Sequence, residues 1–192
     1  MRYLQTLFLL GLTLLPLAAE EAMPPVPRKA QEFVINLPDG SQKLLSSYRG
    51  KVVVMQFLFT TCPHCQAASR LLTKLKGEYE GKGVEVIGVA FNDMSKMLVT
   101  DYSHDHKVNF PVGFANREPV MVFLGLAPDA RLSVPQMVFI DRKGTIRQQS
   151  KPVMDEKAAT EENIRTMLNT LTKEPGSATS SGSPKATAKK KS

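Results

Sequence analysis

Cysteine is scarce in this 192-residue sequence, and tryptophan is absent from it. The two cysteines, Cys62 and Cys65, lie three positions apart, so they cannot cross-link distant parts of a fold. A disulfide that closes so small a loop would also constrain the unfolded chain very little. The pair therefore indicates a chemical role rather than a structural one.

A second cysteine pair is also missing, and no histidine stands directly after Cys65. Structural zinc needs four ligands and haem attachment needs Cys-x-x-Cys-His, whereas position 66 is glutamine. A copper-binding module that uses Cys62, Cys65 and either His104 or His106 stays open as an alternative. Those two histidines are expected to face solvent, and no Met- or His-rich motif supports copper binding. We predict no metal and no cofactor.

The formal net charge is +7, yet no basic stripe interleaved with aromatic residues accompanies it. Nucleic-acid binding is therefore not favoured. Residues 174–192 concentrate positive charge and contain no large apolar residue, so we predict a disordered, Lys-rich tail. A weak contact of this tail with anionic lipid or cell wall is the alternative to a solvated tail.

No cysteine stands directly after the apolar run near the N-terminus, so a lipoprotein anchor is not expected. Residues 1–22 carry one basic residue at position 2 and continue as an apolar run followed by small residues, which is the layout of a secretory signal peptide. Cleavage after Ala19 would place Leu17 where a small residue is usual, so an uncleaved membrane anchor is the alternative. In both cases the chain is predicted to be exported, to the periplasm or another oxidising extracytoplasmic compartment.

One domain is expected, over residues 32–173, after a Pro-rich spacer at 23–31. Its apolar patterns alternate between strand and helix periods, which is typical of an α/β fold. The predicted strands are 33–37, 42–45, 51–59, 84–91, 137–140 and 145–148, with a short extended piece at 109–112. The predicted helices run from the cysteine motif to the glycines at 81–83, and over 94–106, 118–124 and 157–173.

Segments 51–59 and 84–91 are continuously apolar and enclose one helix, so they are predicted to be parallel, buried strands. The last two strands are predicted to form an antiparallel hairpin across the turn at 141–144. The first two are predicted to do the same across 38–41. The sheet is therefore expected to be mixed.

The Cys62-Pro63-His64-Cys65 motif falls between a buried strand and an amphipathic helix. Unpaired N–H groups and the dipole at a helix N-terminus favour a negative charge, and the thiolate is the attacking species. Cys62 is therefore the predicted nucleophile, and Cys65, one turn further, the predicted resolving cysteine. Pro63 is tolerated in the first turn. His64 would further stabilise the thiolate, unless it is a surface residue without a role.

From about residue 33 to 172 the chain resembles the thioredoxin-like superfamily, specifically the exported TlpA/ResA-like branch of the redoxin (AhpC/TSA-type) group. The resemblance is carried by segment 45–54, by the Cys-Pro-His-Cys motif and by segment 133–144. It implies a thioredoxin fold, with a central mixed β-sheet flanked by helices and an N-terminal β-hairpin extension. It also implies that Pro135 is cis and faces the dithiol, and that Val134 offers its backbone to a bound substrate segment.

Two positions depart from the family pattern. Thr60-Thr61 stand where a tryptophan is usual, and Gln56 stands where some thioredoxins carry a buried acid that serves the resolving cysteine. The proton acceptor for Cys65 is therefore left open.

The resemblance implies a thiol–disulfide oxidoreductase with a redox-active Cys62–Cys65 disulfide. Its partners would be protein thiol or disulfide substrates and a membrane or periplasmic redox protein, and the chain would be a monomer. The branch more often reduces its targets, whereas strongly oxidising periplasmic oxidases share the Pro-His dipeptide, so the direction of electron flow is left open. A thiol peroxidase is an alternative because segment 59–63 is similar to peroxiredoxins, although Phe59 stands where those proteins carry threonine.

Overall fold

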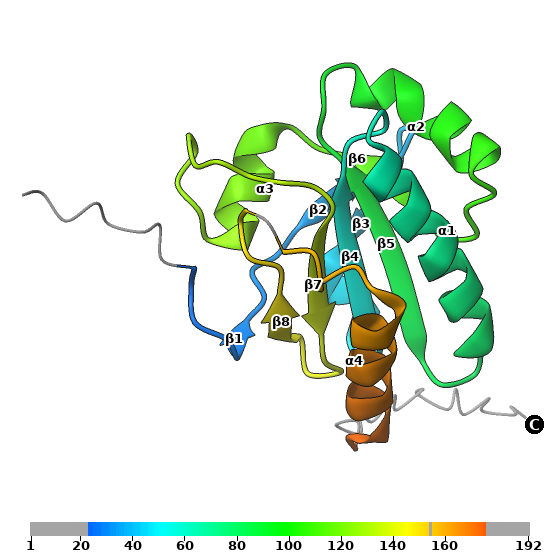
Figure 1. The fold of residues 1–192 in the computed structure, drawn as a ribbon, viewed down its shortest axis with the longest axis vertical. Coiled ribbons are helices and arrows are strands. Elements are labelled where there is room, and N and C mark those ends of the chain that lie inside the picture. The colour runs from blue at the N-terminus through cyan, green and yellow to red at the C-terminus, as the bar shows by residue number, and fades with distance from the viewer. Residues whose placement is uncertain (1–22, 154, 176–192) are drawn as a thin grey trace, which may run out of the picture.

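The computed structural model describes residues 23–153 and 155–175. Their framework is one eight-stranded sheet with the strand order β1-β8-β7-β4-β5-β6-β2-β3 (Figure 1). The strands are β1 (Arg28–Lys29), β2 (Val34–Asn36), β3 (Gln42–Leu44), β4 (Val52–Leu58), β5 (Val84–Ala90), β6 (Val112–Phe114), β7 (Gln136–Ile140) and β8 (Thr145–Gln149). The helices are the 3-10 helix η1 (Leu45–Tyr48), α1 (Pro63–Glu78), α2 (Ser95–Asp105), α3 (Arg117–Leu124) and α4 (Glu161–Lys173).

The sheet is mixed, as expected. Strand β4 is parallel to β5 and antiparallel to β7, and all seven of its residues are buried. Its alternate side chains therefore enter two separate cores. One core packs β4 against α1, α2 and α4, and the other packs it against α3 and the N-terminal hairpin β2–β3. Figure 1 shows α1 and α4 covering one face of the sheet.

Helix α1 starts and stops for local reasons. Pro63 occupies its first turn, and Cys62 precedes it with extended backbone angles of φ −85° and ψ 118°. Leu72 and Leu75 lie on its buried face. The helix ends at Glu78, before the predicted glycines, and those glycines form the following turn with φ of 77° and 72°.

The segment at 23–31, predicted to be a spacer, instead contributes β1 to the sheet. Arg28 pairs with Ile146, and the Ala30 N–H donates to the Gly144 carbonyl at 3.0 Å. The Arg28 guanidinium donates to the Gln149 side chain. This strand exists through its long-range pairing with β8, and that pairing cannot be predicted from a short Pro-rich sequence.

Two other boundaries differ from the prediction. The segment predicted as extended at 109–112 yields β6 only from Val112 onward, because Pro111 has no N–H to donate to the ladder. The Pro111 carbonyl still accepts from the Gly88 N–H. Helix α4 begins at Glu161 rather than at residue 157. The Thr160 hydroxyl accepts from the Asn163 N–H at 3.3 Å and caps the helix there.

The predicted leader, residues 1–22, and all but the first two residues of the predicted tail lie outside the described residues. Within the part of the chain that the structure describes, no helix is both long and apolar enough to cross a bilayer.

Candidate active site

The cysteine motif lies where the central strand β4 gives way to α1 (Figure 1). The short connection is held by hydrogen bonds at both ends. The Cys62 N–H donates to the Phe59 carbonyl at 3.1 Å, and the Gln66 side chain donates to the Thr60 carbonyl at 3.0 Å. The Thr60 N–H donates to Asn92, just beyond β5, at 2.9 Å. These contacts hold Cys62 at the N-terminus of α1, as predicted.

The two cysteines have different environments. Cys62 is partly exposed, whereas Cys65 is completely buried, and both are free thiols in this structure. Burial raises the pKa of the Cys65 thiol well above its usual range, because a thiolate there would lose its hydration. Cys62 occupies the N-cap position of α1, at the helix end whose unpaired N–H groups favour a negative charge. An incoming disulfide can therefore reach Cys62 but not Cys65.

The loop before β7 lies against Cys62. The Cys62 Sγ is 3.9 Å from the Val134 carbonyl oxygen, and the Val134–Pro135 peptide is cis, as the resemblance implied. The Gln136 side chain holds this loop by donating to the Ser133 carbonyl at 2.7 Å and to the Lys151 carbonyl at 3.0 Å. The structure thus brings Val134, with Pro135 next to it, to Cys62 from 72 residues further along the chain.

His64 is exposed, and its ring makes no hydrogen bond or ion pair to any other described residue. It lies at the rim of a cavity of about 520 Å³ beside the motif. The apolar lining of that cavity includes Leu71, Val134, Pro135 and Ala159. His64 therefore borders the surface next to the cysteines, and no contact in the structure demonstrates a tuning role for it.

Gln56, predicted to stand in place of an acid, is completely buried behind Cys65. Its side-chain amide donates to the Cys65 carbonyl at 2.9 Å and accepts from the Ser69 hydroxyl at 2.8 Å. The Tyr102 hydroxyl lies 2.7 Å from Ser69 Oγ and also donates to the Cys65 carbonyl at 3.2 Å. Sequence reasoning missed Ser69 and Tyr102. The available signal was polar groups on the apolar faces of α1 and α2.

The distant histidines do not join the cysteines. His106 Nδ1 lies 3.2 Å from Arg70, and the exposed His104 lies 3.2 Å from Asp105. Among the described residues no group of three or more His, Cys, Asp or Glu side chains could hold a metal ion. The copper alternative therefore receives no support from the geometry.

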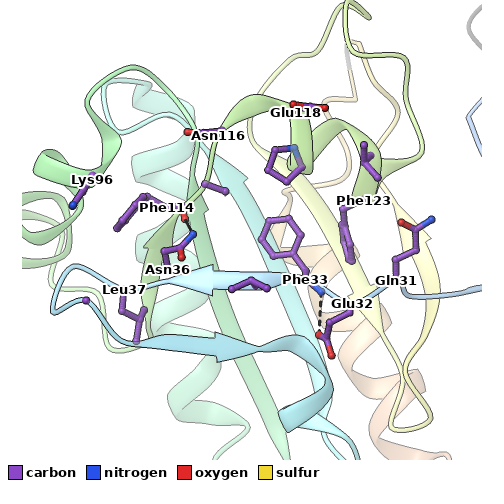
Figure 2. A pocket seen from close by; sticks show the side chains of 15 residues that line it. Gln31, Glu32, Phe33, Asn36, Leu37, Lys96, Phe114, Asn116, Glu118 and Phe123 are labelled. Carbon is purple, nitrogen blue, oxygen red and sulfur yellow. Dashed lines mark hydrogen bonds between the residues drawn. The ribbon is translucent and has the colours of Figure 1, made fainter.

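Figure 2 shows a second cavity, of about 790 Å³, bordered by β2, the β2–β3 turn and α3. Phe33 and Phe123 contribute much of its apolar wall, and the Asn36 side chain donates to the Phe114 carbonyl at 3.3 Å. Lys96 of α2 lies at one end. No residue of the cysteine motif or of the 133–136 loop lines this cavity, so it is separate from the candidate active site.

The chain is similar to known proteins over the region that carries this site. A sequence model of the AhpC/TSA family matches residues 26–149, which include both cysteines and Pro135. The thiol-disulfide oxidoreductase ResA of Geobacillus thermodenitrificans is 26% identical over 119 residues, covering 62% of this chain and 65% of that protein. ResA of Bacillus thuringiensis subsp. konkukian is 26% identical over 124 residues, covering 65% and 68%. The match to the first relative thus spans slightly less than two thirds of its length.

Solved structures share the architecture. A thioredoxin-family thiol:disulfide interchange protein from Chlorobium tepidum superposes with a TM-score of 0.63 at 19% identity. The superposition covers 78% of this chain and 99% of that one. This likeness concerns the fold, and it confirms the predicted thioredoxin-like α/β fold with its mixed sheet flanked by helices.

Proposed function

The chain belongs to the AhpC/TSA family, and we propose that within this family it acts as a thiol–disulfide oxidoreductase on protein substrates. The observation that carries the proposal is the contrast between a reachable Cys62 and a buried Cys65 on one helical turn. Its relatives named ResA, which are themselves described as thiol-disulfide oxidoreductases, add support.

The proposed reaction has two exchange steps. In the reductive direction the Cys62 thiolate attacks a substrate disulfide, forms a mixed disulfide and releases one substrate thiolate, which takes up a proton. Cys65 then loses its proton and attacks Cys62 Sγ. A Cys62–Cys65 disulfide forms, and the second substrate sulfur leaves as a thiolate that is protonated. The substrate gains two electrons and the chain loses two, and the oxidative direction is the reverse.

The surface around Cys62 suits a polypeptide substrate. The Val134 carbonyl beside the sulfur is a backbone acceptor that an extended segment can meet, and Pro135 presents an apolar ring next to it. We assign Val134 and Pro135 to substrate contact and Pro63 to the start of α1. His64, at the rim of the adjoining cavity, is the proposed tuning residue for the Cys62 thiolate.

The proposal is tested on the full-length chain, together with Cys62→Ser and Cys65→Ser. The wild-type chain should reduce insulin when supplied with a dithiol. Cys62→Ser should abolish the exchange, because the accessible sulfur is gone, and Cys65→Ser should accumulate the mixed disulfide, which mass spectrometry detects. Exchange that survives Cys62→Ser contradicts the proposal. Stoichiometric copper uptake or peroxide consumption without dithiol exchange would instead favour the alternatives.

The potential and the location are the remaining parts of the proposal. We expect a reduction potential above that of thioredoxin, about −270 mV, because the Pro63-His64 dipeptide favours the reduced form. Equilibration with glutathione buffers measures it, and a value at or below that of thioredoxin contradicts this expectation. We also propose that the chain works outside the cytoplasm with a membrane or periplasmic redox partner. After a dithiol reductant has opened the Cys62–Cys65 disulfide, a thiol reagent that cannot cross the inner membrane should then label Cys62 in intact cells, and failure to label it would refute this location.

A further inference from the structure

We propose that Gln56, Ser69 and Tyr102 form a neutral buried clamp that positions Cys65 for its attack on Cys62. This inference rests on the proposed dithiol exchange and deepens it, because it assigns positioning residues to the second step. All three side chains are buried behind the resolving cysteine, so they are positioning residues and not substrate contacts.

The clamp joins three elements at one backbone carbonyl. Gln56 comes from the middle of β4, Ser69 from α1 one turn after Cys65, and Tyr102 from α2. Gln56 and Tyr102 both donate to the Cys65 carbonyl oxygen, at 2.9 Å and 3.2 Å. The first turn of α1 is thereby fastened to the sheet on one side and to a neighbouring helix on the other.

Ser69 completes the cluster by linking its two donors. Its hydroxyl donates to Gln56 Oε1 at 2.8 Å, so it can only accept in its 2.7 Å contact with Tyr102 Oη. The single Tyr102 hydroxyl proton is thus shared between Ser69 Oγ and the Cys65 carbonyl oxygen. Gln56 and Ser69 are completely buried, and Tyr102 is 4% exposed. A buried polar group that loses its partner is destabilising, so each member of the cluster holds the others in place.

All members of the clamp are uncharged at physiological pH. Burial raises the pKa of Tyr102 to about 12, so its hydroxyl keeps the proton that it donates. Amide and serine side chains do not ionise in this range. The clamp therefore cannot act as the base for Cys65, and its contribution to the exchange is geometric.

Geometry matters most in the step in which Cys65 reacts. The Cys65 sulfur must approach Cys62 Sγ in line with the bond to the substrate sulfur, which breaks as the intramolecular disulfide forms. The electrons of that bond leave with the substrate thiolate, which takes up a proton equivalent to the one that Cys65 gave up. A misplacement of about 1 Å in such a step can lower its rate about 100-fold. The same orientation sets how strongly the Cys62–Cys65 disulfide is favoured over the dithiol.

The test compares Tyr102→Phe and Gln56→Met with the wild-type full-length chain. Tyr102→Phe removes one donor with little change in shape, and Gln56→Met removes the other without shortening the side chain much. We expect each variant to lower the equilibrium constant for the internal disulfide about tenfold, which raises the reduction potential by about 30 mV. Release of substrate from the mixed disulfide should slow by a similar factor, while the first attack by Cys62 keeps its rate.

Tyr79→Phe is the matched control. Tyr79 is also 4% exposed, and its hydroxyl donates to Asn169 at 2.6 Å, but it follows the far end of α1, 14 residues after Cys65. The Tyr79→Phe variant should lower the free energy of unfolding as Tyr102→Phe does, and it should leave the reduction potential unchanged. The inference is overturned if Tyr102→Phe and Gln56→Met keep the wild-type potential and release rate, or if Tyr79→Phe shifts both equally. Absence of any exchange in the wild-type chain would instead contradict the proposed function.

Discussion

The burial of Cys65 predicts that the reduced protein loses stability in mildly alkaline solution. Its thiol has a raised pKa in the folded state because burial disfavours the thiolate. The unfolded chain has an ordinary thiol pKa of about 8.5. Above that pH the unfolded state releases a proton that the folded state keeps. The stability contributed by neutral Cys65 is therefore complete below pH of about 8.5 and declines as the pH rises above it.

The size of the effect follows from one proton. Each pH unit above the unfolded pKa lowers the free energy of unfolding by about 1.4 kcal/mol, as long as folded Cys65 stays protonated. Cys65→Ala removes the titrating group and should lack this component. We therefore expect reduced wild-type protein to lose about 1.4 kcal/mol more than reduced Cys65→Ala between pH 7.5 and pH 9.5.

Urea denaturation with a phosphine reductant at both pH values measures the difference. Groups other than Cys65, Tyr102 among them, are common to both chains, so their contributions largely cancel in the comparison. Equal losses for the wild-type chain and Cys65→Ala would show that Cys65 ionises as easily in the folded state as in the unfolded one. The assignment of a protonated, buried resolving cysteine would then be refuted.

Two further predictions concern packing and capping. Gly113→Ala should destabilise the protein by about 1–3 kcal/mol, because a Cβ there would overlap Ile35 and lie 2.5 Å from the Asn36 carbonyl oxygen; a wild-type urea midpoint would contradict this. Thr160→Ala should cost about 1 kcal/mol, because the Asn163 N–H loses its cap, whereas Thr160→Ser keeps the hydroxyl and most of the stability. Thermal unfolding of the two variants checks this, and identical melting temperatures would exclude the cap.

Elements with strong local patterns were predictable from the sequence. Strands β4 and β5 are continuous apolar runs, and α1 begins at a cysteine-proline pair and has an apolar face. All three elements can therefore be predicted without knowledge of the rest of the fold. Strand β1 was not predictable, because it has two residues and exists only through its pairing with β8. The start of α4 was misplaced because the competing cap at Thr160 is a single hydrogen bond.

The candidate site also has parts that the sequence predicts and parts that it does not. Cys62 and Cys65 follow from a motif of four residues, and the cis bond before Pro135 follows only from the family resemblance. The surroundings of Cys65 could not be derived, because the contacts of Ser69 with Gln56 and Tyr102 bridge separations of 13 and 33 residues. No periodicity within one element indicates which buried polar groups of three different elements will meet.

The two outer strands of the sheet bear on edge-to-edge association between chains. An exposed strand offers unpaired N–H and C=O groups to a second chain, and natural proteins counter this with short edges and lysines. Here β1 has two residues, both basic, and β3 has three, with Lys43 in the centre. Without β1 the five-residue β8 would become the outer strand on that side of the sheet. Arg28 and its neighbours thus shield the longer strands from edge-to-edge aggregation.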